Sequence, residues 1–236
     1  DVSGNAAAAA VTATTNSSSV TYDETIPTIS SITTKDTNGN GSVDTATIVF
    51  DAAVDDSTFS AGNFTIGGSA ATGITTGTAD DNTFDVTIAP EIVGTDVKQV
   101  TYTAGSGADL AGNLLASVAN GDEAETDGAS PVMISAETTS TTTVNVTFSE
   151  DLNGTTDAAS DFTVAGVTVS GTSELAGVIT LTTSAFGTGD TPLITMSALG
   201  NGVQDSVGNI SPLGQTITPT DNVDPVITSV TSTTSN

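Results

Sequence analysis

Residues 36–44, with the sequence DTNGNGSVD, place oxygen-bearing side chains at alternate positions. Alternate side chains of a tightly curled loop converge on one point, and hard cations such as Ca²⁺ bind carboxylate, amide and carbonyl oxygens. Gly41 falls where such a loop must turn sharply, so the segment matches the Ca²⁺-loop spacing D-x-[DN]-x-[DN]-G. The predicted ligands are the side chains of Asp36, Asn38, Asn40 and Asp44 and the carbonyl of Ser42.

This loop departs from the Ca²⁺ pattern at its last position, where Thr47 stands in place of a bidentate glutamate. A carboxylate from elsewhere in the chain, such as Asp51 or Asp85, would then have to complete the coordination shell. The alternative is a turn rich in Gly and Asn that holds no ion. No helical pattern flanks the segment, so we expect it to connect two strands.

The composition of the chain limits what other chemistry is available. The 236 residues include 28 Asp and Glu but only 2 Lys and Arg, and there is no His, Cys or Trp, so the net charge is −26. These absences exclude a thiol nucleophile, a Ser-His-Asp triad, a disulfide and a His- or Cys-ligated zinc site. Nucleic-acid binding is also excluded, since its affinity comes from Lys and Arg. Oxygen ligands for hard cations remain.

Internal repetition organises the chain. The motif DxxGN occurs at residues 1–5, 109–113 and 205–209, and an acidic stretch followed by a proline recurs at Pro27 and again further along the chain. A long segment from Ala46, ATIVFDAAVDDSTFSAGNFTIGG, also aligns with VNVTFSEDLNGTTDAASDFTVAG. We therefore predict the C-terminal part of one repeat at 1–26, complete repeats at 27–130 and 131–224, and the first strand of another at 225–236.

Each repeat carries the two-residue periodicity of β-strands. Val144, Val146 and Phe148 alternate with polar residues, and Phe84, Val86 and Ile88 do the same. High charge with only 4% aromatic residues is typical of disordered chains, but a disordered chain has no reason to keep such alternation. No apolar run approaches the ~18 residues of a membrane span, and the first residues lack the basic region of a signal peptide. Short strands with frequent turn signals predict an all-β chain of tandem β-sandwich domains.

Several short motifs carry a family resemblance. An apolar strand ends in one Phe before an acidic turn (IVFDAAVD, VTFSEDLN), a second strand follows (NFTIGG, DFTVAG), and DLAGN or DSVGN precedes the next acidic stretch and proline. The chain resembles the tandem immunoglobulin-like repeats of prokaryotic cell-surface proteins, above all the surface-layer (S-layer) proteins of ammonia-oxidising archaea. The resemblance implies tandem immunoglobulin-like β-sandwiches and an extracellular location on the cell surface or in the cell wall.

The junctions between repeats are a second candidate for cation binding. Acidic residues gather just before Pro131 and Pro225, and a Ca²⁺ held between two sandwiches would stiffen them, as in cadherin-like chains that the Asp-Asn-x-Asp-Pro segment resembles. The alternative is a short polar linker that is solvated and binds no ion. DxxGN is favoured here as a turn in which Asp caps the turn and Gly takes a positive φ, although its Asp could join a shell. The candidate ligands are Glu125, Asp127, Glu150, Asp205, Asp221, Asn222 and Asp224.

Glycosylation is a further expectation. The sequon Asn-x-Ser/Thr is an acceptor for N-linked glycans in exported archaeal proteins and a chance match in most bacterial ones. Asn40 also starts a sequon, but we assign it to the loop. The candidate acceptors are Asn16, Asn63, Asn145, Asn153 and Asn209.

These observations predict a structural protein rather than an enzyme, because no aromatic sugar platform or cleft-forming insertion accompanies the carboxylates. We expect a Ca²⁺-stabilised S-layer segment that assembles with copies of itself and whose acidic lattice favours the passage of cations. The alternatives are the repetitive extender of a giant adhesin and a subunit of an extracellular filament. In the filament, an apolar segment such as Val226 to Val230 would complete the sheet of a neighbour.

Overall fold

The computed structural model describes residues 23–197, 202–227 and 229–233, and these residues form β-strands, turns and three short 3₁₀ segments, with no α-helix among them. The all-β class predicted from the alternation is confirmed. Within the described residues, no helix is long and apolar enough to cross a membrane. The 3₁₀ segments are η1 (Asp56–Thr58), η2 (Ala61–Asn63) and η3 (Ala159–Asp161).

The strands from β1 to β9 form the first of two β-sheet units, which we call the first module. Seven of its strands make one curled sheet in the order β7-β4-β5-β6-β2-β1-β9, and β3 pairs separately with β8. The strands are β1 (Ile29–Lys35), β2 (Ser42–Phe50), β3 (Val54–Asp55), β4 (Phe64–Ile66), β5 (Ser69–Thr75), β6 (Thr83–Val93), β7 (Val100–Tyr102), β8 (Ala108–Asp109) and β9 (Glu125–Asp127).

The strands from β10 to β17 form the second module. Its larger sheet has the order β13-β14-β11-β10-β17, and its smaller sheet has the order β12-β15-β16. The strands are β10 (Met133–Ser140), β11 (Thr143–Phe148), β12 (Phe162–Val164), β13 (Val169–Leu175), β14 (Val178–Thr183), β15 (Ile194–Met196), β16 (Thr216–Ile217) and β17 (Thr220–Asp221).

Each module has its own hydrophobic core, built from the alternating apolar residues. In β11, Val144, Val146 and Phe148 are buried while the residues between them are only partly buried, as their period of two requires. Phe64 and the matching Phe162 are both buried, one in each core. The first core lies within the predicted repeat 27–130 and the second within 131–224. The exact boundaries of the repeats stay predictions.

The two modules repeat the same strand pairing. Ile29 of β1 pairs with Phe50 of β2, and Met133 of β10 pairs with Phe148 of β11, with a bulge after the first pair in both cases. β9 lies parallel to β1, and β17 lies parallel to β10 in the same way. The last strand of each module therefore runs beside its first strand and leads into the linker that follows.

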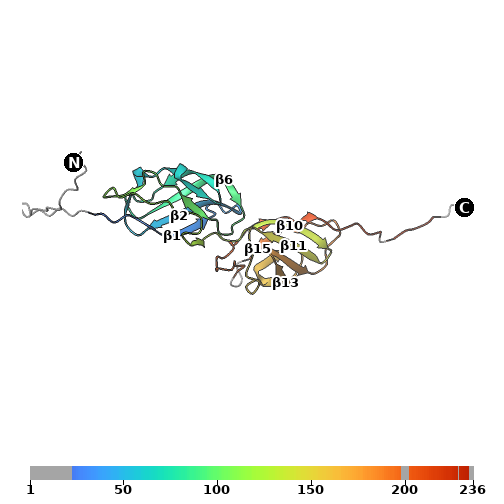
Figure 1. Cartoon of the computed structure of the whole chain (residues 1–236). Coiled ribbons are helices and arrows are strands. Elements are labelled where there is room, and N and C mark those ends of the chain that lie inside the picture. The colour runs from blue at the N-terminus through green and yellow to red at the C-terminus, as the bar shows by residue number, and fades with distance from the viewer. Residues whose placement is uncertain (1–22, 198–201, 228, 234–236) are drawn as a thin grey trace, which may run out of the picture.

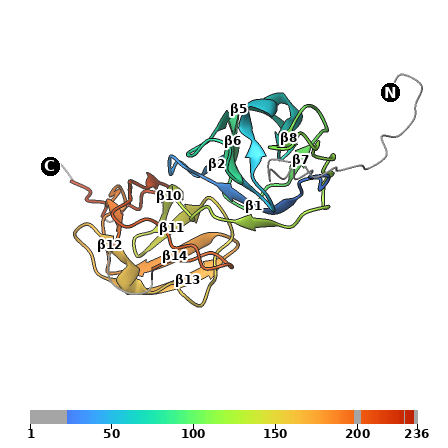
Figure 2. The same ribbon diagram turned by 90° about the vertical axis from the view of Figure 1, so that its left-hand side faces the viewer.

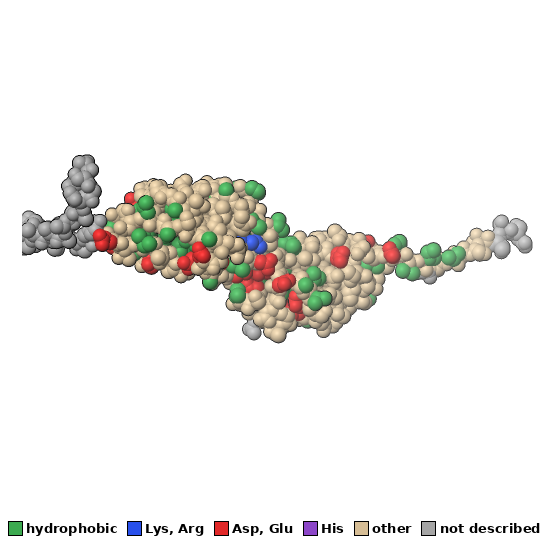
Figure 3. Space-filling view, in the orientation of Figure 1, with side chains coloured by type: hydrophobic (Ala, Val, Ile, Leu, Met, Phe, Trp, Pro, Cys, Tyr) green, Lys and Arg blue, Asp and Glu red, His purple; other side chains and the backbone are tan. Residues whose placement is uncertain are grey.

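The modules lie end to end, and the described chain enters the first module on the side away from the second and leaves the second module on the opposite side (Figure 1). A second view, turned by 90°, shows the same two separate bodies joined by one connection (Figure 2). On the face drawn in Figure 3, acidic side chains gather where the two modules meet, next to a Lys side chain. The junction is therefore both the mechanical link of the structure and a concentration of negative charge.

Candidate metal centre at the module junction

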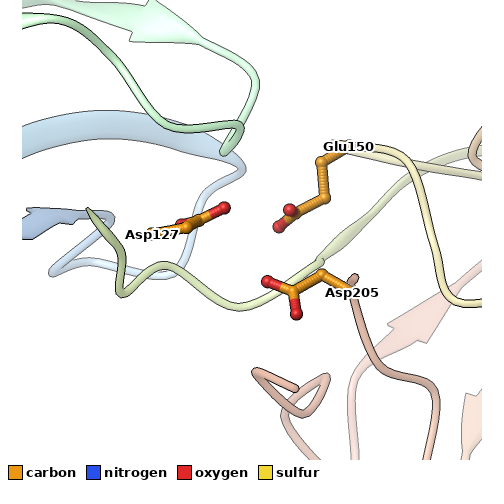
Figure 4. Close-up of side chains that lie close together, drawn as sticks. All are labelled: Asp127, Glu150 and Asp205. Carbon is orange, nitrogen blue, oxygen red and sulfur yellow. The ribbon is translucent and has the colours of Figure 1, made fainter. Parts of the chain in front are cut away.

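Three carboxylates from distant parts of the sequence meet at the junction. Asp127 is the last residue of β9, Glu150 follows the end of β11, and Asp205 begins the DSVGN motif of the second module. Figure 4 shows their side chains directed toward one another where the two modules meet. All three are among the ligands predicted for the junctions, and we call them the junction triad.

The spacing of the junction triad fits one cation. Each of the three residues offers a carboxylate oxygen, and these three oxygens lie within 4.8 Å of one another. Ca²⁺ binds oxygen ligands at about 2.3–2.6 Å, so two ligands on opposite sides of one ion are at most about 5 Å apart. The junction triad therefore has the chemistry and the dimensions to hold a metal ion.

Burial makes the negative charge of Glu150 costly. Glu150 is only 7% exposed and Asp205 only 1%. Burial raises the pKa of Glu150 to about 8, a hydrogen bond from Thr95 opposes the shift, and the charges of Asp127, Asp205 and Asp96 add to it. Every one of these neighbouring charges is negative. The pocket therefore favours either a proton or a cation beside Glu150.

Asp127 shows the same effect in a weaker form. Burial raises its pKa, a hydrogen bond from the amide of Ala129 opposes the rise, and the charges of Asp205 and Asp96 contribute to it. Thr34 pairs with Asp127 in the β1–β9 ladder and is fully buried. Its hydroxyl oxygen has no hydrogen-bond partner among the described residues. The strand that pairs with β9 therefore carries an unsatisfied buried polar group at the position opposite Asp127.

The DSVGN motif holds Asp205 in place. Its Oδ1 accepts hydrogen bonds from the amides of Val207, Gly208 and Asn209, at 2.9, 2.6 and 2.8 Å. Gly208 has φ +100°, which favours glycine. The turn role expected for this motif is therefore confirmed, and the same Asp also belongs to the triad.

Hydrogen bonds tie the two modules together beside the triad. Thr95, in the turn after β6, makes a 2.6 Å bond with the hydroxyl of Ser149 and donates a 2.6 Å bond to Oε1 of Glu150. The amide of Val132, at the entry to the second module, donates to the hydroxyl of Ser149 at 3.0 Å. Glu150 is thus positioned by the first module although it belongs to the second.

The loop predicted from DTNGNGSVD folds as a closed turn between β1 and β2. The carboxylate of Asp36 accepts bonds from the amides of Gly39, Asn40 and Gly41, at 2.8, 3.2 and 2.7 Å. Asp44 instead accepts from the amide and hydroxyl of Thr37. The expected connection between two strands is confirmed, and the second module has only a short turn at the equivalent place.

The carboxylate that reaches this loop is Glu91 of β6. Its two oxygens accept bonds from the side-chain amides of Asn38 and Asn40, at 2.7 and 2.5 Å. The expectation that Asp51 or Asp85 would fill this position is corrected: the carboxylate of Asp51 accepts from Thr28, and that of Asp85 accepts from Thr47. The neighbouring strand β6, which pairs with β2, supplies the acid instead.

The other residues predicted as junction ligands are not grouped with the three carboxylates of the triad. Glu125 accepts from the amide of Val100 while lining the same pocket. In the second module, Asp221 accepts from the amide of Val223, the amide of Asn222 donates to Thr138, and Asp224 is exposed. Sequence reasoning missed Thr95 and Asp96, which carry no motif and reach the site only through the turn after β6.

The predicted glycan acceptors differ in their surroundings. Asn16 lies outside the described residues. The side-chain nitrogens of two others act as donors: Asn63 donates to the carbonyl of Thr103, and Asn209 donates within the junction. Asn145 accepts from Thr180, and Asn153 accepts from Thr155. Glycosylation at these positions stays a prediction.

No protein-family model and no curated protein matches the chain. Among solved structures, it is similar to SGBP-B from the mixed-linkage glucan utilization locus of Bacteroides ovatus, solved in complex with a mixed-linkage heptasaccharide. The identity is 22% and the TM-score 0.28, over 80% of this chain and 45% of that one. The present chain thus spans about half the length of that protein, and a similarity of this level says nothing about what it binds.

The raised pKa of Glu150 predicts a pH dependence in the cation-free chain. The pKa rises from 4.5 to about 8 on folding, so over this range the folded chain keeps a proton that the unfolded chain releases. The free energy of unfolding should therefore fall as the pH rises from about 4.5 to about 8. Chemical denaturation in excess chelator at several pH values measures this trend, and Glu150→Gln should flatten it. Parallel pH profiles for the two chains would contradict the assignment.

Proposed function

We propose that this chain is a structural, non-catalytic segment of a self-assembling cell-surface protein whose modules are locked in line by Ca²⁺. The observation that carries the proposal is the junction triad, because it places three carboxylates from both modules in one largely buried pocket. A site built from both sides of a junction is occupied only when the modules hold one relative position. Binding there stabilises that position by its binding free energy.

Electrostatic repulsion explains why a cation is needed. The three carboxylate oxygens lie within 4.8 Å of one another, and two unit charges at the largest of these distances repel by about 3–4 kcal/mol at an effective dielectric constant of about 20. A divalent cation turns this repulsion into attraction and also satisfies the carboxylate oxygens. Ca²⁺ suits the site better than Mg²⁺, since Mg²⁺ requires shorter ligand distances and keeps more of its own water.

We propose the loop at residues 36–44 as a second Ca²⁺ site that supports the same junction. Its ligands would be Asp36, Asn38, Asn40 and the carbonyl of Ser42, with Glu91 in place of the missing bidentate glutamate. Gly41 of this loop packs on the second module: a Cβ at this position would lie 2.8 Å from Cγ2 of Ile134 and 3.3 Å from Cβ of Ser149. An ordered loop therefore forms part of the surface on which the second module rests.

The net charge of −26 supports assembly controlled by cations. Neighbouring copies of so acidic a chain repel one another at low ionic strength, so assembly needs divalent bridges or screening by salt. With the motif resemblance, this favours an S-layer of immunoglobulin-like modules whose partners are further copies of the chain. Pores lined by carboxylates would concentrate cations and deplete anions.

The extender of an adhesin is the second candidate. It is favoured by the end-to-end arrangement of the modules (Figure 1). A rod of this kind needs stiff junctions but no lateral contacts. A different observation supports the filament alternative, in which this apolar segment completes the sheet of a neighbour. Val226, Ile227 and Val230 are 70%, 81% and 84% exposed.

Calcium titration of the full chain tests the cation sites. We expect Ca²⁺ binding, measured by isothermal titration calorimetry, to lose one site in Glu150→Gln, or to weaken there by at least about tenfold, because the shell loses a charged ligand. Asp36→Asn should remove a different site, in the loop. Asp190→Asn, which alters an exposed carboxylate of the second module outside the pocket of the triad, is the matched control and should bind like the unchanged chain. Equal binding by Glu150→Gln and the unchanged chain would contradict the proposed junction site.

Electron microscopy of the assembled protein tests the S-layer assignment. At matched ionic strength, we expect a regular sheet that dissolves when a Ca²⁺ chelator is added and forms again when Ca²⁺ is restored. Isolated rods that are indifferent to the chelator would contradict the S-layer and favour the extender.

A further inference from the structure

An aspartate with the same local structure precedes each of the three linkers. Asp23, Asp127 and Asp221 each lie four residues before a proline. In each case Oδ1 accepts a hydrogen bond from the amide two residues further on, at 2.9, 3.0 and 3.0 Å. The three residues are therefore equivalent, and we call them the linker aspartates.

Two of the linker aspartates are bound by the DxxGN motif of the module that follows. The side-chain amide of Asn113 donates to the carbonyl of Asp23 at 3.1 Å, and that of Asn209 donates to the carbonyl of Asp127, also at 3.1 Å. Each Asn also donates to the Asp of its own motif, Asp109 or Asp205. The same contact thus forms twice, between residues more than 80 positions apart in the chain.

The surroundings of the two contacts also match. One pocket is lined by Asp127, Glu150, Asp151, Ser206 and Val207, among others, and another by Asp23, Ala52, Ala53, Asp109, Leu110 and Ala111. Glu150 and Ala52 hold the same place, because each is the second residue after the phenylalanine that ends its strand. The first pocket contains the triad. The second pocket has the methyl group of Ala52 at the position where the first has the carboxylate of Glu150.

We propose that the DxxGN motif holds each module to the one before it, because its Asn binds the backbone carbonyl of the preceding linker aspartate. The residue at position 150 in one joint, or 52 in the other, then decides whether that joint binds a divalent cation. The second of these statements rests on the proposed function of the triad. The joint at Asp127 is then a cation-dependent joint, and the joint at Asp23 is held by the Asn contact without a cation.

The partner of Asp221 follows from this assignment. Asp221 has the geometry of the other linker aspartates, and Ile227 and Val230 occupy the positions of Ile29 and Ile32, which are 5% and 0% exposed in the first module. The surface formed by Asp221 and the segment that follows it therefore fits another module of this kind, one with a DxxGN motif to bind the aspartate and a core to bury Ile227 and Val230.

Spin-label distances test the role of the Asn. The chain has no cysteine, so Ala70→Cys and Ser173→Cys, both at exposed strand positions, give one label on each module. With Ca²⁺ removed by chelator, we expect Asn209→Ala to broaden the distance distribution between the modules. Asn113→Ala changes the same motif at the other joint and should leave the distribution narrow. Equal widths for these two variants would overturn the proposal.

A gain of Ca²⁺ binding tests the role of position 52 in the full chain. Such a gain cannot result from a variant that merely fails to fold. Ala52→Glu is expected to bind one more Ca²⁺ per chain than the unchanged protein, by isothermal titration calorimetry, whereas Ala52→Gln should bind the same number. No additional ion in Ala52→Glu would overturn the role given to this position.

Comparison with Glu150→Gln separates this inference from the proposed function. If Glu150→Gln loses an ion and Ala52→Glu gains none, the junction site stands and the general role of the position fails. If Glu150→Gln loses none, the proposed function of the triad fails, while a gain in Ala52→Glu would still support the role given to position 52, and the spin-label distances still decide the role of the Asn.

Discussion

Repulsion between three carboxylates is the constraint on which the junction depends. Asp127, Glu150 and Asp205 have oxygens within 4.8 Å of one another, and two of the three side chains are more than nine-tenths buried. A folded chain can tolerate this arrangement only if a proton or a cation offsets the charge. The two choices have different consequences, since a proton neutralises one carboxyl group while a divalent cation joins all three. If the proposed cation binds there, it couples the relative position of the modules to the ionic conditions outside the chain.

The β architecture delivers these groups to one place. The last strand of each module runs parallel to its first strand, so the linker aspartate leaves the sheet at the end where the next module begins. The end of β11 brings Glu150 back to the same edge, and the DSVGN turn fixes Asp205 through three backbone amides. The loop before β2 then adds a packed surface through Gly41. Each contribution is local, and together they make a joint with contacts from both modules.

Much of this arrangement could be predicted from the sequence, because it depends on periodicity and repetition. Alternation in segments such as Val144 to Phe148 predicted strands, and the repeated DxxGN and proline positions predicted two equivalent modules. The three residues of the junction triad were among the candidates predicted from the acidic residues near the linkers and from the DxxGN motif. The role of Glu91 and Thr95 could not be predicted, since it depends on which strands pair and where β6 ends. The contact of Asn209 with the Asp127 carbonyl could not be predicted either, because the sequence of a turn motif does not indicate which distant backbone carbonyl its Asn side chain will contact.

The central claim is that one divalent cation lies between Asp127, Glu150 and Asp205. The most direct measurement is an experimental structure of the Ca²⁺-loaded chain, with anomalous scattering used to locate the ion. We predict an ion at about 2.3–2.6 Å from an oxygen of each of the three residues. A junction in which these carboxyl groups bind only protons, water or one another, in the presence of Ca²⁺, would contradict it.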